Sequence, residues 1–511
     1  MPATRILAFV ALLSAAALVS NCAVGPDFKP ATPPEVDRYT REPLPAQTMS
    51  TSVAGGQAQR FVKDLDIPAE WWTLFHSPKL NGLIEQSLKA NPNLQATMAA
   101  LRIAQENVRA QEGKFLPLVQ GNFNPTRQQS TNNALGTQLP LADGSTTNAF
   151  NVVTSQVIVS YTLDVWGQNR RAVESLQAQA DSERFLVEAA YLTLTSNIAL
   201  ATIQEASLRD QITATQELIN ISARMLGVLH RQLSAGYSSR VDVAAQEAQL
   251  AQTIATLPPL QKQLAQQRDL IAALAGRFPS EEPLKTFTLS GFHLPRDLPV
   301  SLPSRLVEQR PDVRSAQELV HSASAQVGIA IANMLPNFTI NATGGYTSTA
   351  LANFADYFSP TNRFLTLAGN VTQPIFDGFS LLHQKRAAEA AYDQATSQYR
   401  ATVIGAVQNV TDTLRALQAD ANALRAASIF ERAAKTSLDL VRQQFDIGYA
   451  NILLLLNAQQ TYLQARIALI QTRANRLSDT VALFQALGGG WWNRADLTLS
   501  QAADDLNVKP E

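Results

Sequence analysis

Few residues of this 511-residue chain have the types and spacing that chemistry at a site requires. Its five histidines are scattered, without the HExxH or HxH spacing that directs two imidazoles to one metal ion. Sequences of the GxSxG and Walker types are absent, so neither a nucleophile elbow nor a phosphate-binding loop is indicated. We therefore expect no enzyme, no metal and no cofactor. The histidines are His76, His230, His293, His321 and His383.

The single cysteine, Cys22, has surroundings that predict a covalent role. Arg5 and the apolar run 6–19 form a signal too short to span a bilayer, and residues 19–22 (VSNC) resemble a bacterial lipobox. Cleavage would make Cys22 the acylated first residue, anchored by about 0.8 kcal/mol per buried CH₂. Asn21 departs from the usual Gly or Ala, and the alternative is an ordinary export signal with an incidental cysteine. Ala23 follows, not the Asp that retains lipoproteins in the inner membrane.

The composition suits long, closely packed helices. Charged residues make up 16% of the chain and the formal net charge is −1, so no basic surface for nucleic acid is indicated. From residue 187 to 233, mostly apolar positions recur every 3.5 residues, which is the seam of a coiled coil. A helix over about 169–235 would be about 100 Å long at 1.5 Å per residue. Gly236 and Tyr237 end it, and a returning helix begins near 241 and is interrupted at Pro258 and Pro259.

The second half of the chain repeats the first. Residues 90–117 align without a gap on residues 309–336, so that Pro92 falls on Pro311. A second long seam helix ends in QFDIGY at 444–449, which matches QLSAGY at 232–237. The sequence therefore predicts a mainly helical protein with a duplicated unit of helix, strand, strand and long helical hairpin.

Four segments alternate apolar and polar residues. In PNFTINATGGYTST at 336–349, Phe338 and Ile340 point one way and Asn337 and Thr339 the other. The other segments begin near 118, 151 and 363, with polar loops over about 126–148 and 350–362. Each strand could cross a bilayer, but four strands cannot close a barrel, so two, three or four copies would have to share eight, twelve or sixteen strands. The alternative is a small soluble β-domain packed on helices.

Composition shifts divide the chain into six expected regions. Proline-rich stretches mark a tether before the first repeat and a linker between the repeats. The regions are a lipoprotein signal peptide (1–21), a tether (22–68), a first repeat (69–277, strands about 118–165, hairpin about 169–276), a linker (278–303), a second repeat (304–488, strands about 337–376, hairpin about 380–487) and a C-terminal tail (489–511).

Four motifs resemble the outer-membrane factors of tripartite efflux pumps: CAVGPDF at 22–28, EWWTLFHSPKLNGLIEQSLKANPNLQA at 70–96, QRPDV at 309–313 and QPIFDG at 373–378. The chain is similar to the TolC-like proteins, in particular the NodT-type lipoprotein branch. This resemblance implies a homotrimer with a twelve-stranded β-barrel in the outer membrane of a Gram-negative bacterium and an α-helical periplasmic barrel. It implies passive export of small molecules, with a periplasmic adaptor and an inner-membrane resistance–nodulation–division pump as partners.

The resemblance also implies that the hairpin turns form a closed periplasmic tip, which docks on the adaptor and opens. The corresponding residues are Gly236, Tyr237, Arg240 and Asp242 in the first hairpin and Gly448, Tyr449, Leu454 and Asn457 in the second. Related proteins often have Asp at the positions of Leu454 and Asn457, so an acidic ring is not expected there.

Two questions about the tip are left open by the residues. The leucines at 453–456 either gate the aperture by dewetting or pack the hairpin seam. Asp242 supplies either a carboxylate to the aperture or only a charge at a helix N-terminus. The alternative to a channel is a periplasmic lipoprotein adaptor or scaffold, which would have one hairpin and compact soluble β-domains.

Overall fold

The computed structural model describes residues 23–30, 38–131, 147–281, 285–348 and 357–494; the signal peptide and Cys22 lie outside the described residues. The chain divides into two compact units, each assembled from three stretches of sequence. Unit 1 consists of Met1–Pro30, Arg102–Ser182 and Gln317–Gln398, and unit 2 of Ala31–Leu101, Glu183–Ala316 and Tyr399–Glu511.

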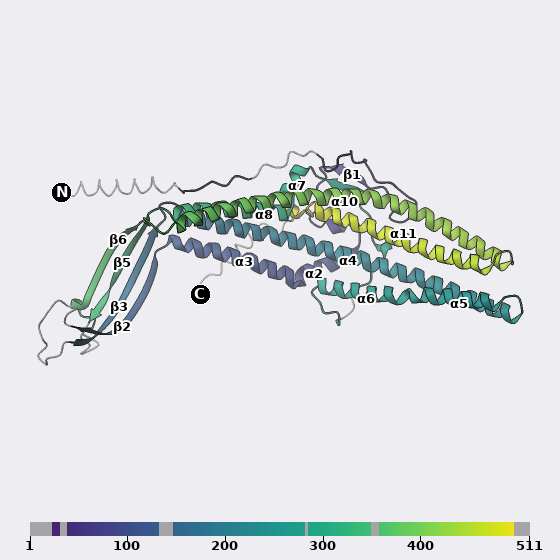
Figure 1. The fold of residues 1–511 in the computed structure, drawn as a ribbon, viewed down its shortest axis with the longest axis horizontal. Coiled ribbons are helices and arrows are strands. Elements are labelled where there is room, and N and C mark those ends of the chain that lie inside the picture. The colour runs from purple at the N-terminus through teal and green to yellow at the C-terminus, as the bar shows by residue number, and fades with distance from the viewer. Residues whose placement is uncertain (1–22, 31–37, 132–146, 282–284, 349–356, 495–511) are drawn as a thin grey trace. The chain divides into compact units, whose positions relative to one another are not determined.

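Unit 1 contains one antiparallel sheet with the strand order β2-β3-β5-β6 (Figure 1). Each repeat supplies one pair of adjacent strands, and the repeats meet where β3 pairs with β5. Val159 aligns with both Val119 and Ala342, so the apolar faces predicted from alternation coincide across the strands. The strands are β2 (Leu118–Thr131), β3 (Thr147–Leu163), β5 (Asn337–Ser348) and β6 (Arg363–Thr372).

The first two strands are longer than the sequence predicted. The bounds predicted for the first polar loop, about 126–148, are wrong at both ends, because β2 continues to Thr131 and β3 begins at Thr147. Pro125 does not end β2, because the pairing with β3 continues on both sides of it. Continued pairing also satisfies backbone groups that a loop would leave to water. β6 is shorter than predicted and stops at Thr372, just before Gln373 and Pro374.

Helices lead into and out of both strand pairs of unit 1. α3 (Pro92–Glu112) precedes β2 and α4 (Gln168–Ser234) follows β3, while α8 (Pro311–Ala332) precedes β5 and α10 (Ser380–Asp446) follows β6. The repeats are joined where strands meet helices: the Trp166 indole N–H donates to the carbonyl of Pro336 at 2.8 Å. Nearby, the Gln168 amide donates to Asn333 Oδ1 at 2.6 Å.

The two long helices each have 67 residues, and their seams are buried in unit 2 as predicted. Ile198 and Leu208 of α4 and Leu414 and Leu424 of α10 are at most 3% exposed. One stretch of α4 is apolar enough to cross a membrane by composition, but most of it is buried within the protein. The returning helices are α5 (Arg240–Ala255), α6 (Leu257–Leu274) and α11 (Ile452–Ala486). The break before the proline pair at 258–259 is confirmed, since prolines fit the first turn of α6.

The tether and the linker are more ordered than their compositions indicated. In unit 2, β1 (Arg60–Lys63) from the tether pairs in parallel with β4 (Asp297–Val300) from the linker. The fully buried Arg476 of α11 donates to the carbonyls of Gly55 at 2.9 Å and Gln57 at 2.6 Å and to the Thr48 hydroxyl at 3.0 Å. These contacts hold the tether against α11, which composition could not reveal.

An aromatic core and the end of the chain close unit 2. The buried Trp71 stacks on Phe484, with ring centroids 5.5 Å apart. Past α11, the Trp491 indole donates to the carbonyl of Gln309 at 2.7 Å, so the start of the expected tail is packed against the core; residues 495–511 lie outside the described residues. Within the described residues, the remaining helices are η1 (Trp71–Phe75), α2 (Pro78–Ala90), η2 (Gly113–Phe115), η4 (Leu289–Gly291), α7 (Pro303–Gln309), η5 (Pro360–Asn362) and η6 (Trp491–Asn493).

Candidate functional site

The two hairpin turns of unit 2 have the same backbone conformation. Gly236 and Gly448 have φ of +81° and +83°, in the left-handed region that favours glycine. The next residue closes a Schellman motif in each turn: the Tyr237 N–H donates to the carbonyl of Gln232, and the Tyr449 N–H to that of Gln444, both at 2.8 Å. The tyrosine side chains are 86% and 83% exposed, so each turn presents an aromatic ring to its surroundings.

Asp242 caps α5 at the first turn. Its carboxylate accepts from the Ser239 N–H at 2.9 Å and the Ser239 hydroxyl at 2.8 Å, while the Asp242 N–H donates back to the hydroxyl oxygen at 3.1 Å. The bond from the Ser239 N–H, followed by that from its hydroxyl, holds the pKa of Asp242 below its ordinary value. This carboxylate therefore caps the N-terminus of α5. Arg240, the first residue of α5, is exposed.

The leucine run in the second hairpin divides between two environments. Leu455 and Leu456 are buried, whereas Leu453 and Leu454 are 60% and 47% exposed. The buried pair thus packs the seam, and the exposed pair does not. Asn457 is exposed as well. The cluster that covers the buried pair draws on α4, α5, α10 and α11: Met225, Leu229, Val243, Leu438, Val441, Ile452 and Ala458.

The structure shows residues at and near the hairpin turns that the sequence-based analysis missed. Asn451 caps α11, with its side-chain oxygen accepting from the Leu454 N–H at 2.9 Å. Behind the turns lies a buried polar trio in which the Gln246 amide donates to the carbonyl of Ser222 at 3.0 Å and the Ser222 hydroxyl to Gln459 Oε1 at 3.3 Å. Ser222 occupies a seam position in the 3.5-residue repeat, and a polar residue there was the available signal. Such a layer fixes how the helices align.

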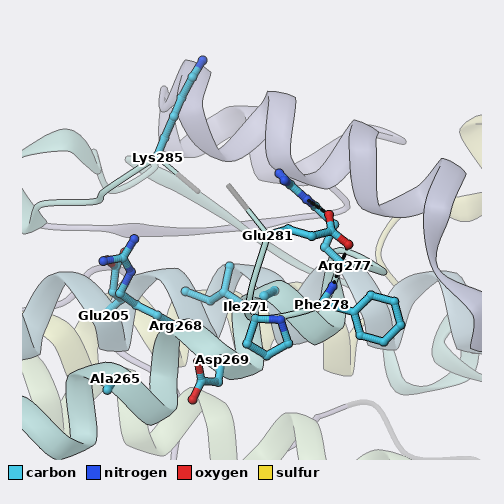
Figure 2. A pocket seen from close by; sticks show the side chains of 11 residues that line it. Glu205, Ala265, Arg268, Asp269, Ile271, Arg277, Phe278, Glu281 and Lys285 are labelled. Atoms are coloured by element: carbon cyan, nitrogen blue, oxygen red, sulfur yellow. Dashed lines mark hydrogen bonds and ion pairs between the residues drawn. The ribbon is translucent and has the colours of Figure 1, made fainter. Parts of the chain in front are cut away.

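A pocket of about 280 Å³ lies elsewhere in unit 2, between α6 and the linker (Figure 2). Two of its acidic side chains have partners: Glu281 accepts from Arg277 at 3.0 Å, and the buried Glu205 accepts from Arg209 at 2.8 Å and from the Phe287 N–H at 3.3 Å. Across the described parts of the chain, no three His, Cys, Asp or Glu side chains lie together as a metal site would need.

The sequence matches a known family over most of its length. The family model described as "Outer membrane efflux protein" matches residues 83–277 and 302–489. The pyoverdine export outer membrane protein OpmQ of Pseudomonas putida is 27% identical over 88% of this chain and 94% of its own. The toluene efflux pump outer membrane protein TtgC of Pseudomonas putida is 24% identical, over 97% and 98%. Nodulation protein T of Rhizobium leguminosarum bv. trifolii is 24% identical, over 93% and 96%.

Solved structures share the fold of the chain. The CmeC outer membrane channel of Campylobacter jejuni superposes with a TM-score of 0.83 at 19% identity, covering 95% of this chain and 98% of its own. The outer-membrane channel OprN superposes with a TM-score of 0.79 at 22% identity, over 92% and 100%. The outer membrane protein VceC of Vibrio cholerae gives 0.73 at 25% identity, over 83% and 100%. With its amphipathic sheet and paired long hairpins, this chain therefore belongs to the outer membrane efflux protein family and is an efflux channel of the bacterial outer membrane.

Proposed function

We propose that three copies of this chain form the exit duct of a tripartite efflux pump, with one twelve-stranded barrel shared among them. The observation that carries this proposal is the open sheet of unit 1, in which β2 and β6 each pair with one described strand only. Large side chains on its apolar face are exposed, including Phe123 (67%), Leu365 (75%) and Leu367 (76%). In lipid an unpaired strand edge costs several kcal/mol per backbone group, so β2 of one copy would pair with β6 of the next.

The other face of the sheet suits a water-filled lumen. The Ser160 hydroxyl donates to Asn341 Oδ1 at 2.7 Å across β3 and β5, and the hydroxyls of Thr154 and Thr347 lie 3.2 Å apart. Twelve strands with this alternation, apolar outside and polar inside, match the pattern of membrane barrels. The long hairpins would continue the duct in the periplasm as a helical wall whose apolar seams are buried between helices.

Opening would take place at the hairpin turns, where the adaptor docks. The exposed Tyr237 and Tyr449 would offer aromatic anchors to that adaptor, with Arg240 and the ionised Asp242 beside the first of them. The exposed Leu453 and Leu454 would close the resting aperture by dewetting, with Asn457 next to them. These assignments also give the glycines at 236 and 448 their role as turn-forming hinges.

The duct would carry small molecules without catalysis, and an inner-membrane pump of the resistance–nodulation–division class would supply the driving force. The functions for which two relatives are named, pyoverdine export for OpmQ and toluene efflux for TtgC, support small organic cargo. We further propose that the signal 1–21 is removed, that Cys22 carries the lipid, and that the repeats span 69–277 and 304–488.

Two measurements on the purified full chain test this proposal. Native mass measurement in detergent should give a trimer, and planar bilayers should show a small resting conductance. Leu454→Ala should raise that conductance, and Asn457→Asp should favour cations, because the first widens an apolar constriction and the second adds charge beside it. Leu440→Ala, which removes a leucine of similar exposure from α10 outside the turn, should change neither the resting conductance nor the ion preference. Monomers only, or a protein that fractionates away from the outer membrane as an adaptor would, refutes the proposal.

A further inference from the structure

The segment Ala23–Phe28 of unit 1 lies in a fitted site on α4 and α8. We propose that this segment, named here the anchor latch, is held by the protein itself and fixes the N-terminus where strand β3 passes into α4. Only the statement about lipid rests on the proposed acylation of Cys22; the contacts that hold the latch do not depend on it. If Cys22 bears lipid, the latch determines where that lipid enters the membrane.

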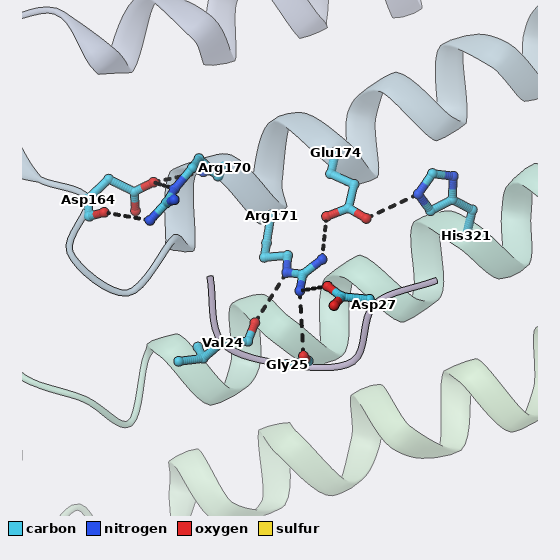
Figure 3. A network of polar contacts seen from close by, with 8 residues as sticks. All are labelled: Val24, Gly25, Asp27, Asp164, Arg170, Arg171, Glu174 and His321. Carbon is cyan, nitrogen blue, oxygen red and sulfur yellow. Dashed lines mark hydrogen bonds and ion pairs between the residues drawn. The ribbon is translucent and has the colours of Figure 1, made fainter. Parts of the chain in front are cut away.

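The backbone of the latch fits its site closely (Figure 3). The Val24 N–H donates to the carbonyl of Trp166 at 3.0 Å, and Arg171 Nε donates to the carbonyl of Val24 at 3.2 Å. Gly25 has a φ of +100°, and a methyl group on it would overlap the backbone of Gly328 in α8. A side chain at position 25 is therefore excluded twice, by conformation and by space.

Charge holds the same segment in place. The side chain of Arg171 is 6% exposed and donates to Asp27 Oδ1 and to Glu174 Oε2, both at 2.7 Å. A further guanidinium nitrogen points to the carbonyl of Gly25 at 3.5 Å. Three of the four acceptors around this guanidinium come from the latch, namely the carbonyls of Val24 and Gly25 and the carboxylate of Asp27. Removing the latch would take away these three acceptors and leave Glu174 as the remaining partner of the guanidinium among the described residues.

The latch also joins the two repeats. The ring of Phe28 stacks on His321 of α8, with centroids 4.4 Å apart and an interplanar angle of 13°. His321 in turn contacts Glu174 of α4 at 3.1 Å (Figure 3). It also contacts Glu318 at 3.4 Å. One short segment therefore touches the first repeat through Arg171 and the second through His321.

The position of the latch limits where lipid can enter the bilayer. One peptide bond, about 3.8 Å between Cα atoms, separates Cys22 from Ala23. Ala23 packs closely on Gly167, because a Cβ on Gly167 would overlap Ala23. The neighbouring Trp166 is of a residue type that is enriched at membrane surfaces. Acyl chains on Cys22 would thus enter lipid beside the start of α4, which sets the membrane surface at the root of the sheet.

Limited proteolysis tests the latch in the folded full-length protein. Chymotrypsin cuts after aromatic residues, and cleavage after Phe28 releases peptide 22–28, which mass spectrometry detects with its lipid. Gly25→Ala should release this peptide on the order of tenfold faster than wild type, because local opening controls cleavage. The matched control Gly82→Ala, at a helical glycine with open space around it, should match wild type. Arg171→Met, which keeps Gly25, should also release it faster.

Two further outcomes separate the latch from the lipid. Cys22→Ser, exported behind an ordinary signal peptide, should be cleaved as slowly as wild type, because protein contacts hold the segment. Equal rates for wild type, Gly25→Ala and Arg171→Met overturn the inference, as does fast cleavage of Cys22→Ser. A protected wild-type peptide without lipid refutes acylation of Cys22 but leaves the latch standing.

Discussion

Asp420 of α10 and Asp479 of α11 should make the second hairpin less stable as pH rises. Burial, followed by the neighbouring Asp479 carboxyl, raises the pKa of Asp420 to about 7, and burial raises that of Asp479 too. Asp420 Oδ2 is a buried oxygen with no hydrogen-bond donor among the described residues. An oxygen in this position is suited to share a proton with the second carboxyl.

The sign and size of the effect follow from that pKa. Between its ordinary value of 3.8 and about 7, the folded chain holds one proton more than the unfolded chain, so stability falls as pH rises through this window. At about 1.4 kcal/mol per pH unit the full shift corresponds to about 4 kcal/mol. Because the carboxyls are only partly buried, water screens the pair, and we expect about 2 kcal/mol. The loss is complete above pH 7.

Asp420→Asn removes this titration while keeping a donor for Asp479. Urea unfolding followed by circular dichroism in detergent should show the variant about 2 kcal/mol more stable than wild type at pH 8 and nearly equal to it at pH 4.5. Asp412→Asn, at an exposed carboxylate on the same helix, should follow wild type at both pH values. A constant difference between Asp420→Asn and wild type from pH 4.5 to 8 would refute the shared proton.

Three smaller changes probe other contacts. Arg476→Met should cost about 3 kcal/mol in urea unfolding, because it leaves buried acceptors of the tether unpaired, whereas Arg415→Met at an exposed site should cost little. Ser239→Ala should cost about 1 kcal/mol locally and speed hydrogen exchange in the first turn of α5 without affecting α11. Tyr357→Phe loses the hydrogen bonds from the tyrosine hydroxyl to Ser155 at 2.9 Å and to the carbonyl of Tyr346 at 3.0 Å. The proposed trimer should then dissociate at a lower temperature on heating, by an amount consistent with a loss of about 1 kcal/mol in stability. An unchanged dissociation temperature would contradict this.

Periodicity made the sheet faces and the long seams predictable, because each is encoded locally. Alternation at 337–346 fixes which side chains share a face, whatever the partner strand is. The 3.5-residue repeat likewise fixes the buried stripe of α4. Gly236 and Gly448 could be placed at turns because left-handed backbone favours glycine.

Contacts between distant segments were not predictable in the same way. The pairing of β1 with β4 and the contacts of Arg171 with Asp27 join residues far apart in sequence and have no periodic signal. The division of the leucine run at 453–456 depends on what α4 and α10 bring to its buried side. The length of β2 depends on its place at the sheet edge, which alternation alone cannot give.

The equal lengths of α4 and α10 restrict how such a molecule can vary. Both helices bury a seam that returns to the same face every seven residues, so an insertion of two or five residues would rotate everything beyond it away from its partner. Only whole heptads keep the seam. Each added heptad must be matched in the other long helix and in the returning helices of both hairpins if the two turns are to stay at the same distance along the helices. The helices of relatives of different length should therefore differ in steps of about 10 Å, with all the hairpin helices lengthened or shortened together.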